Sequence, residues 1–221
     1  AILSSAAKLV TGDIKYTPTD GTPGLKKAII RYTEENYDRL VAPENVIVSA
    51  GAKQSVYNVL YSIINPQDEV IILAPYWVSY PELVRMVFGV PVIVTPEYGT
   101  FYPRMEDIKK VVGPNTRAVI VNSPNNPSGV VYSNEFIKEI VDFCETKGIY
   151  LIVDDIYHKL IFDGRKAPNA YGHTKKDIEN TMVRIGDAVA GDFGGQMPAA
   201  FTADRPAHLQ FVVRPDYNSG S

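Results

Sequence analysis

The sequence predicts an α/β fold, a three-layer sandwich in which a mostly parallel sheet forms the middle layer and helices cover both of its faces. Short runs rich in Val and Ile are typical of strands buried on both faces, and they alternate with stretches whose apolar residues recur at helical spacing. The distances between these runs fit strand–helix–strand units, which build parallel sheets. Strands are expected at residues 46–48, 69–74, 90–94, 119–121 and 149–153.

Helices are expected between these strands, where apolar residues recur three or four positions apart. At the start of the chain, residues 6–10 are typical of a helix end that Gly12 closes, and a loop dense in Pro and Gly follows at residues 15–24. Breaks such as Asn65-Pro66 and Gly148 end two of the later helices. These later helices are predicted at residues 25–40, 56–64, 82–88, 106–112 and 134–147.

The composition is that of a folded globular protein. Of the 221 residues, 45% are hydrophobic and 21% are charged, which allows a sizeable core and argues against disorder. The net charge of −3 gives no support for a nucleic acid or an anionic membrane as partner. No apolar run approaches the ~20 residues that span a bilayer, and the first residues lack the basic start of a signal peptide.

The single cysteine, Cys144, excludes an internal disulfide and suggests a reducing compartment, so a cytoplasmic location is expected. Cys144 falls within the helix predicted at residues 134–147. A buried packing thiol is a better interpretation there than a nucleophile.

The chain is expected to divide into two parts of unequal order. Residues 1–190 form an incomplete large domain, and residues 191–221 form a divergent tail without a sustained pattern. Within the tail only residues 208–213 look like a strand, and residues 218–221 look like a disordered end or an appended segment.

Two of the predicted strands lead into groups that suit a phosphorylated aromatic ligand. After residues 46–48, Gly51-Ala52 enters a helix, where exposed N–H groups favour an anion and small residues allow a phosphate to approach. After residues 69–74 comes Trp77, whose indole ring can lie flat on an aromatic ligand. Each feature alone also fits a common helix start or an ordinary core aromatic.

Two further strand ends carry amide, carboxylate and phenol groups. Asn122 and Asn126 lie in the loop that follows residues 119–121. Two prolines and a glycine make this loop rigid, although Asn and Pro also favour ordinary turns. Asp154 directly follows an apolar strand, with Tyr157 three residues later. A carboxylate there is costly to bury without a cationic partner. A protonated ring nitrogen fits this role better than a metal ion does. Apart from His158, no further metal-ligating side chain lies at a suitable spacing from Asp154 and Asp155.

Five runs of the sequence together resemble the fold-type I pyridoxal-phosphate enzymes, specifically class I/II aminotransferases of the bacterial aspartate aminotransferase-like group. Their order along roughly residues 6–186 is that of the family, and five ordered motifs are far more specific than one. The runs are Lys15-Tyr-Thr-Pro-Thr-Asp-Gly, Ser49-Ala-Gly-Ala-Lys-Gln-Ser, Ala74-Pro-Tyr-Trp-Val-Ser-Tyr-Pro, Val121-Asn-Ser-Pro-Asn-Asn-Pro-Ser-Gly and Val153-Asp-Asp-Ile-Tyr. The resemblance implies the large-domain fold of these transferases and pyridoxal 5′-phosphate as cofactor.

The resemblance also implies a role for each matching residue. Trp77 would stack on the pyridine ring, and Asp154 would keep its nitrogen protonated so that the ring acts as an electron sink. Asn126 and Tyr157 would hydrogen-bond the ring's 3-oxygen, with Asn122 nearby. The phosphate would be held by Gly51, Ala52, Lys53 and Arg184. Tyr16 would reach the phosphate of a neighbouring subunit, which implies a homodimer.

The region before Arg184 departs from the family pattern. Family members place a strand and a Ser-Lys pair there, whose lysine forms a Schiff base with the cofactor, and this strand and loop are expected to be missing here. Lys176 lies at the family's Lys-to-Arg spacing and is the candidate for that lysine. Its charged surroundings, residues 174–180, are instead typical of a solvated surface turn.

The implied activity is the transfer of an amino group from an amino acid to a 2-oxo acid, with Lys176, Tyr157 and Asp154 as the catalytic candidates. The family's N-terminal substrate loop and its small domain, with the arginine that clamps the substrate carboxylate, are not recognised. The chain is therefore expected to be an altered, truncated or recombined large domain whose transaminase turnover is in doubt. The alternatives are a non-catalytic module that binds a phosphorylated ligand, and an engineered or minimised scaffold derived from such an enzyme.

Overall fold

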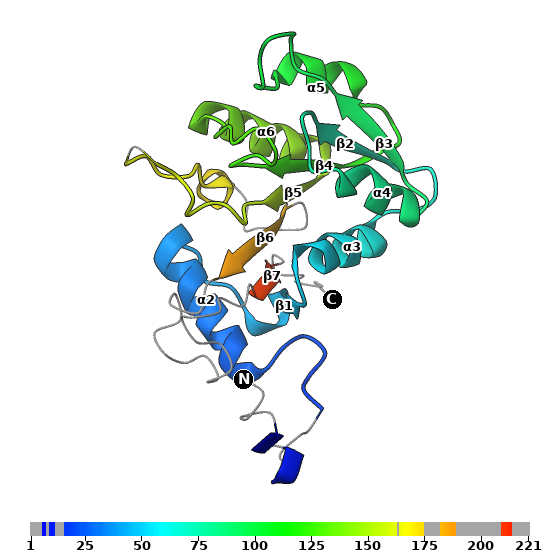
Figure 1. Ribbon diagram of the computed structural model, residues 1–221. Helices are drawn as coiled ribbons and strands as arrows, with labels where there is room; N and C mark the ends of the chain where they lie inside the picture. Colours follow the sequence, from blue (N-terminus) through cyan, green and yellow to red (C-terminus); the bar gives the residue numbers. More distant parts are fainter. Residues whose placement is uncertain are drawn as a thin grey trace.

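A seven-stranded sheet forms the centre of the structure, a computed structural model that describes residues 6–7, 9–11, 16–162, 164–174, 182–188 and 209–213. In the last two ranges only the side chain of Ile185 is described. The strand order across the sheet is β1-β7-β6-β5-β4-β2-β3 (Figure 1). The strands are β1 (Val46–Ser49), β2 (Glu69–Leu73), β3 (Val90–Val94), β4 (Thr116–Asn122), β5 (Tyr150–Asp154), β6 (Met182–Ala188) and β7 (Leu209–Val213).

Most of the sheet is parallel. β2 pairs in parallel with β3 and β4, β4 pairs in parallel with β5, and β5 pairs in parallel with β6. Only β7 runs the other way, and it pairs antiparallel with both β6 and β1. Because the parallel strands point the same way, the loops that follow them emerge at a common edge of the sheet.

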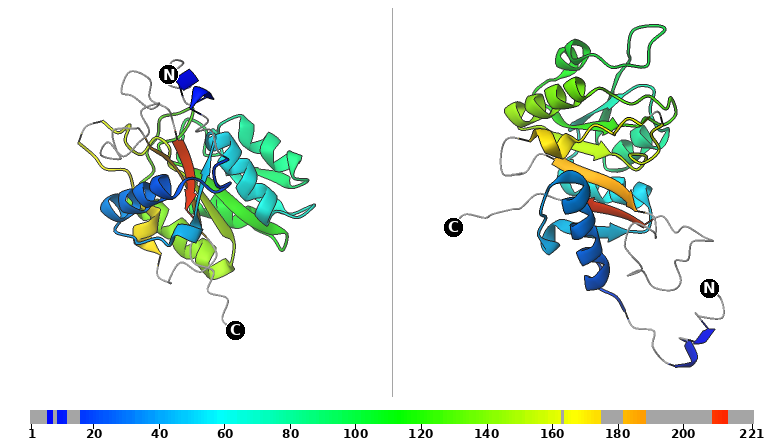
Figure 2. Two further views of the ribbon diagram at one scale, coloured as in Figure 1. Left: turned by 90° about the horizontal axis from the view of Figure 1, so that it is seen from below. Right: turned by 90° about the vertical axis from the view of Figure 1, so that its left-hand side faces the viewer.

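Helices cover both faces of the sheet, as Figures 1 and 2 show. Helices α2 (Pro23–Tyr37), α5 (Met105–Val111) and α6 (Asn134–Lys147) contribute to one buried apolar cluster. Helices α3 (Ala52–Ile63) and α4 (Ser79–Met86) contribute to the other. There are also two short 3-10 helices, η1 (Pro43–Asn45) and η2 (Ala170–His173). The predicted three-layer α/β fold with a mostly parallel sheet is confirmed.

Alternation along the strands explains why the central strands are apolar throughout. In β2, Ile71 belongs to the cluster under α5 and α6, whereas Ile72 belongs to the cluster under α3 and α4. Successive side chains of a strand point to opposite faces, so a strand between two helical layers needs apolar residues at every position.

Local signals set the bounds of α6. At its start, the Ser133 hydroxyl accepts a hydrogen bond from the Phe136 N–H at 3.1 Å. At its end, Gly148 terminates the helix with φ 68°.

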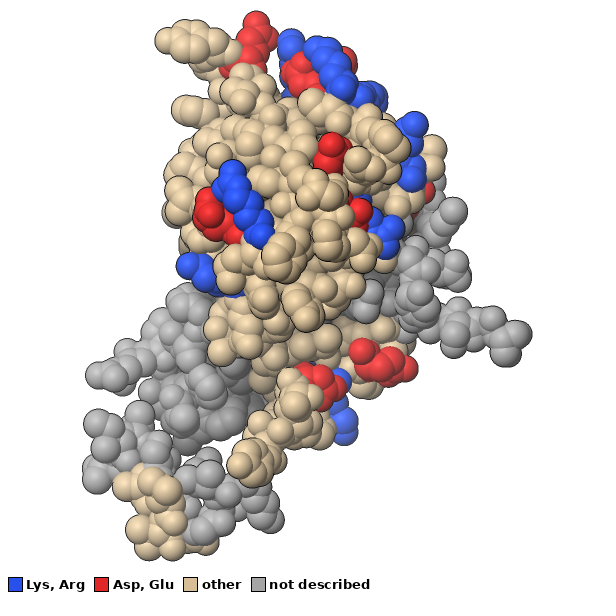
Figure 3. Space-filling model, turned by 90° about the vertical axis from the view of Figure 1, so that its right-hand side faces the viewer, with Lys and Arg blue, Asp and Glu red and all other residues tan. Residues whose placement is uncertain are grey.

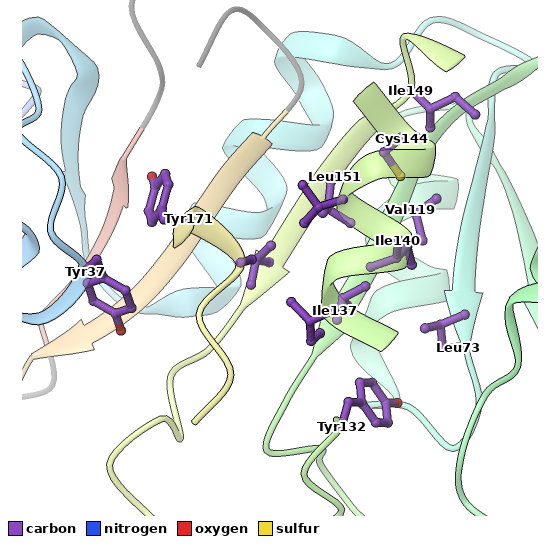
Figure 4. Packing of buried hydrophobic residues seen from close by; sticks show 14 of the residues in the cluster. Tyr37, Leu73, Val119, Tyr132, Ile137, Ile140, Cys144, Ile149, Leu151 and Tyr171 are labelled. Carbon is purple, nitrogen blue, oxygen red and sulfur yellow. The ribbon is translucent and has the colours of Figure 1, made fainter. Parts of the chain in front are cut away.

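The core beneath α6 contains Cys144 (Figure 4). Its side chain is only 1% exposed, which agrees with the interpretation of this residue as a packing thiol. Burial raises the pKa of the Cys144 thiol to about 12, because the charged thiolate loses its hydration there.

Cys144 is therefore expected to resist thiol reagents in the native protein. The ordinary cysteine pKa is about 8.5, so a rise to about 12 lowers the thiolate fraction at pH 8 about a thousandfold or more. The measurement is the rate of reaction with a chromogenic disulfide in buffer and in denaturant, and the single cysteine of the chain makes the signal unambiguous. Equal rates in the two conditions would show that Cys144 is accessible.

The structure corrects the expectation that no strand forms before Arg184. Arg184 lies inside β6, where its partner in register is Val153 of β5. The pattern Met182-Val-Arg-Ile was too short and too polar to stand out as a strand, and pairing with the buried strand β5 decides its conformation. The strand-like residues of the tail form β7, which lies between β6 and β1. The expected boundary at residue 190 and the expected disordered end at 218–221 lie outside the described residues.

Charged side chains of both signs lie on one face of the molecule, and the described helices have at most 15 residues. On the face shown in Figure 3, the described Lys and Arg side chains lie among Asp and Glu side chains, and neither sign forms a continuous patch there. Within the described part of the chain, no helix is both long and apolar enough to cross a membrane.

Candidate functional site

A cavity of about 280 Å³ lies beyond the carboxyl ends of β1, β2, β4 and β5, and it is the candidate site. Its size is close to the lower end of small-ligand pockets, which begin at roughly 300 Å³. Eight residues that the sequence singled out line it together: Gly51, Ala52, Lys53, Trp77, Asn122, Asn126, Asp154 and Tyr157. Two lining residues, Tyr80 and Ile156, were not predicted.

One end of the cavity is the N-terminus of α3. Gly51 caps this helix with φ 109°, a backbone conformation that favours glycine. Its carbonyl accepts hydrogen bonds from the N–H groups of Gln54 and Ser55, at 3.1 and 3.2 Å. The N–H groups of Ala52 and Lys53 precede these and have no carbonyl partner within the helix, as at any helix start. Such a terminus favours an anion such as a phosphate.

An aromatic wall stands next to this end. The Trp77 and Tyr80 rings meet edge to face, with centroids 5.4 Å apart and an interplanar angle of 89°. The Lys53 Nζ lies over the indole ring, 5.2 Å from its centroid. A cation above an indole is attracted to the ring's negative face, so Lys53 helps to hold Trp77 while it adds positive charge beside the helix terminus.

The loop after β4 is fixed by its own amide groups. Asn122 donates from Nδ2 to the backbone carbonyl of Asp154 at 2.8 Å, and its Oδ1 accepts the N–H of Asn126 at 2.7 Å. Asn126 in turn donates from Nδ2 to the Tyr157 hydroxyl at 3.4 Å. Asn122 therefore ties the ends of β4 and β5 together, while Asn126 and Tyr157 form a polar pair in the cavity wall.

The loop also depends on Asn125, which sequence reasoning passed over. Asn125 donates from Nδ2 to the carbonyl of Pro75 at 3.0 Å, and its Oδ1 accepts the hydroxyl of Ser128 at 2.7 Å. It thus joins the loop after β4 to the loop after β2. The signal in the sequence was the adjacent pair Asn125-Asn126. Neighbouring side chains point in different directions, so only one of the two amides could face the cavity and the other was free to bind the loop itself.

The buried carboxylate at the floor of the cavity belongs to Asp154. Its residue is 2% exposed, and the Tyr80 hydroxyl donates to Oδ2 at 2.6 Å. Burial raises the pKa of Tyr80 well above its ordinary value, and the nearby Asp154 charge raises it further, so Tyr80 stays a neutral donor. Tyr80 therefore meets the Asp154 carboxyl group as a neutral hydroxyl that donates one hydrogen bond.

The neighbouring acid, Asp155, lies on the other face of the sheet. The Tyr37 hydroxyl of α2 donates to Asp155 Oδ2 at 3.1 Å. Asp154 and Asp155 therefore do not combine into one site. No cluster of three or more metal-ligating side chains occurs among the described residues.

Three predicted site residues are not placed at the cavity. The Tyr16 side chain is fully exposed and does not line it. Arg184 is in β6, and its side chain is not described. Lys176 lies outside the described residues.

A family model described as aminotransferase class I and II matches residues 7–192. The chain belongs to this family. It is 44% identical over 158 residues to a probable aspartate/prephenate aminotransferase of Thermus aquaticus. The matched stretch covers 71% of this chain and 41% of that relative. It is 41% identical over 167 residues to an aspartate aminotransferase of Geobacillus stearothermophilus, which covers 75% of this chain and 42% of the relative. The chain thus spans about two-fifths of the length of these relatives.

Solved aminotransferase structures share the fold. A double mutant of Thermus thermophilus aspartate aminotransferase superposes with a TM-score of 0.78 at 34% identity, over 96% of this chain and 52% of that one. The aspartate aminotransferase of Rhizobium meliloti gives a TM-score of 0.79 at 28% identity, over 96% and 51%. The resemblance stated from the sequence motifs is confirmed.

Pyridoxal 5′-phosphate is the cofactor that membership of the family implies, and the cavity fits it. The helix terminus suits its phosphate, the Trp77 ring suits its pyridine ring, and the Asn126–Tyr157 pair suits a ring oxygen. The buried carboxylate of Asp154 suits a protonated ring nitrogen, because a buried acidic group needs a cationic or hydrogen-bonding partner.

Proposed function

We propose that the chain binds pyridoxal 5′-phosphate in this cavity and serves the transfer of an amino group between an amino acid and a 2-oxo acid. One observation carries the proposal: a helix N-terminus, an aromatic ring, an amide–phenol pair and a buried carboxylate, from four different strand ends, line a single cavity. Each of these groups matches one part of the cofactor.

In this proposal, different side chains contact different parts of the cofactor. The N-terminus of α3 and Lys53 bind the phosphate, and Trp77 fixes the plane of the ring. Asn126 and Tyr157 hydrogen-bond the ring oxygen, and Asp154 keeps the proton on the ring nitrogen. When bound, the cofactor supplies an electron sink for charge that develops at the amino acid's Cα. In this proposal Arg184 is a further phosphate ligand.

Aspartate is the amino donor to test first, because the relatives named above are aspartate or aspartate/prephenate aminotransferases. We also propose a cytoplasmic homodimer in which Tyr16 acts on the partner's phosphate site. The exposed side chain of Tyr16, outside its own cavity, supports this assignment. Sedimentation of the protein at several concentrations tests the dimer.

A second candidate function is the binding of a phosphorylated ligand without turnover. Lys53 is the only lysine among the described residues that line the cavity, and its ammonium group lies over Trp77. This observation favours non-covalent binding unless Lys176 reaches the site. Lys176 is the proposed covalent lysine in the enzymatic alternative.

Two titrations separate these functions. Pyridoxamine 5′-phosphate needs no lysine for binding, so we expect it to quench the fluorescence of Trp77, the single tryptophan of the chain, in a saturable way. Borohydride reduction in the presence of pyridoxal 5′-phosphate, followed by peptide mapping, then identifies any lysine adduct. An adduct on Lys176 together with spectral change on adding aspartate supports the enzyme, quenching without a specific adduct supports binding alone, and no quenching contradicts both.

A further inference from the structure

Lys53 supplies an amine group in the lining of the candidate cavity. It lies in the first turn of α3 and is the only lysine among the described residues that line the cavity. The residue is exposed, so its amine is open to molecules in solution. Within the described part of the chain no carboxylate lies within ion-pair distance of Nζ, which contacts the Trp77 ring instead. An aromatic ring, and not an acidic partner, therefore holds this amine at the cavity.

The N-terminus of α3 places the Lys53 amine close to the position of a bound phosphate. Gly51 caps the helix, and the N–H groups of Ala52 and Lys53 have no carbonyl partner within it. A phosphate bound at this terminus lies beside the backbone from which the Lys53 side chain starts. In pyridoxal 5′-phosphate the aldehyde and the phosphate arm are attached to adjacent ring carbons. Anchoring the phosphate at α3 therefore keeps the aldehyde near the Lys53 amine.

An aldehyde held near an amine reacts with it far faster than the same aldehyde free in solution, because proximity raises its effective concentration by orders of magnitude. The Trp77 ring adds to this effect. Its face suits a flat aromatic ring, and the Lys53 Nζ already lies 5.2 Å from its centroid. The cavity thus brings an anion-binding terminus, a ring-stacking surface and an amine together.

We propose that Lys53 is a covalent attachment site, at which the cavity captures a phosphorylated aromatic aldehyde such as pyridoxal 5′-phosphate. The Lys53 nitrogen forms a bond to the aldehyde carbon, and the carbonyl oxygen leaves as water with two protons from the ammonium group. The product is a protonated imine, so the positive charge beside the phosphate is kept and no oxidant or reductant is needed.

This inference rests on the proposed binding of the cofactor and deepens it. It assigns the covalent bond to Lys53, which lines the cavity, rather than to Lys176. It applies to the binding function as well as to the enzymatic one, because capture at Lys53 requires no turnover. The amine form, pyridoxamine 5′-phosphate, has no aldehyde and stays non-covalently bound.

The test is brief exposure to less than one equivalent of pyridoxal 5′-phosphate, then borohydride reduction and peptide mapping. Lys53 is expected to carry at least about ten times more adduct than any other lysine, the selectivity that proximity provides. Pyridoxal, which lacks the phosphate, is expected to label the lysines without this selectivity. Inorganic phosphate is expected to compete with the labelling of Lys53, because it occupies the N-terminus of α3.

Lys159 is the matched control. Its Nζ lies 4.8 Å from the centroid of the Tyr32 ring, so it also contacts an aromatic face, but it does not line the cavity. Lys159→Arg is expected to leave the labelling of Lys53 and the quenching of Trp77 by pyridoxamine 5′-phosphate unchanged. Lys53→Arg is expected to abolish the selective adduct and to weaken the binding of pyridoxamine 5′-phosphate less than about tenfold, because arginine also binds phosphate but forms no imine.

The outcomes separate this inference from the proposed function. If pyridoxamine 5′-phosphate quenches Trp77 but the adduct forms on Lys176, or in similar yield on Lys53 and Lys159, the inference is wrong and cofactor binding stands. Equal selectivity of pyridoxal for Lys53 also overturns it, because the phosphate then plays no part in capture. If pyridoxamine 5′-phosphate does not quench Trp77, the proposed cofactor binding fails, and phosphate-directed capture at Lys53 fails with it.

Discussion

Replacing Asp154 with asparagine is expected to weaken the binding of pyridoxamine 5′-phosphate by about 3–5 kcal/mol, the cost of breaking a buried charge pair. The residue is buried at the cavity floor, so no water can replace the lost charge beside the ring nitrogen. The ligand-free protein is expected to lose less than about 1 kcal/mol of stability or to gain some, because a buried carboxylate costs more to desolvate than an amide. Trp77 quenching measures the affinity, and denaturant unfolding measures the stability.

Asp155→Asn is the control for this variant. Asp155 is also buried, but its partner is the Tyr37 hydroxyl on the other face of the sheet. Its replacement is expected to change the ligand affinity less than about twofold, and to change the stability as little as Asp154→Asn does, because it too is a buried carboxylate that accepts a tyrosine hydroxyl. If both variants lose affinity equally, the carboxylate of Asp154 has no specific part in binding.

Replacing Ile140 with alanine is expected to lower the free energy of unfolding by about 2–5 kcal/mol, the range for removing a large aliphatic side chain from a core. Ile140 lies on α6, is completely buried and packs in the cluster that also holds Cys144. The loss combines the transfer free energy of the removed carbon atoms with the free energy of the cavity left behind. Urea unfolding followed by far-ultraviolet circular dichroism gives the value.

Leu40→Ala provides the comparison, since Leu40 is an aliphatic residue of the same size that is 78% exposed. Its replacement is expected to change the stability by less than about 0.5 kcal/mol. At temperatures where both variants are folded, both are expected to bind pyridoxamine 5′-phosphate like the native protein. A small loss for Ile140→Ala would mean that the core relaxes to fill the space.

The sequence predicted the central fold well because the buried strands and amphipathic helices have strong local patterns. β4 and β5 consist of apolar runs that only a doubly covered sheet accommodates, and α6 has a serine cap and a terminal glycine. β6 escaped prediction because Arg184 and Gly186 interrupt its apolar character. Its conformation depends on pairing with β5, which no local pattern reports.

The cavity was predictable where a functional group lies at the carboxyl end of an apolar strand, as Asp154 does in β5. Tyr80 was missed because it lies within α4, where an aromatic residue normally indicates packing alone. Its position only three residues after Trp77, just before the helix predicted at residues 82–88, was the available signal that the two rings lie close together. The hydrogen bond to Asp154 is a long-range contact that only the assembled sheet creates.

The position of β7 has a consequence for the order in which the pocket forms during folding. In the described sheet, β1 pairs only with β7, so a segment near the start of the chain is attached through a segment near its end. The N-terminus of α3 directly follows β1, whereas the carboxylate and the amide loop follow strands that pair with near neighbours in sequence. Contacts between distant parts of a chain close slowly, because the connecting chain must first lose its entropy. The anion-binding end of the pocket is thus expected to assemble after the carboxylate and the amide loop, because it waits for β1 to pair with β7.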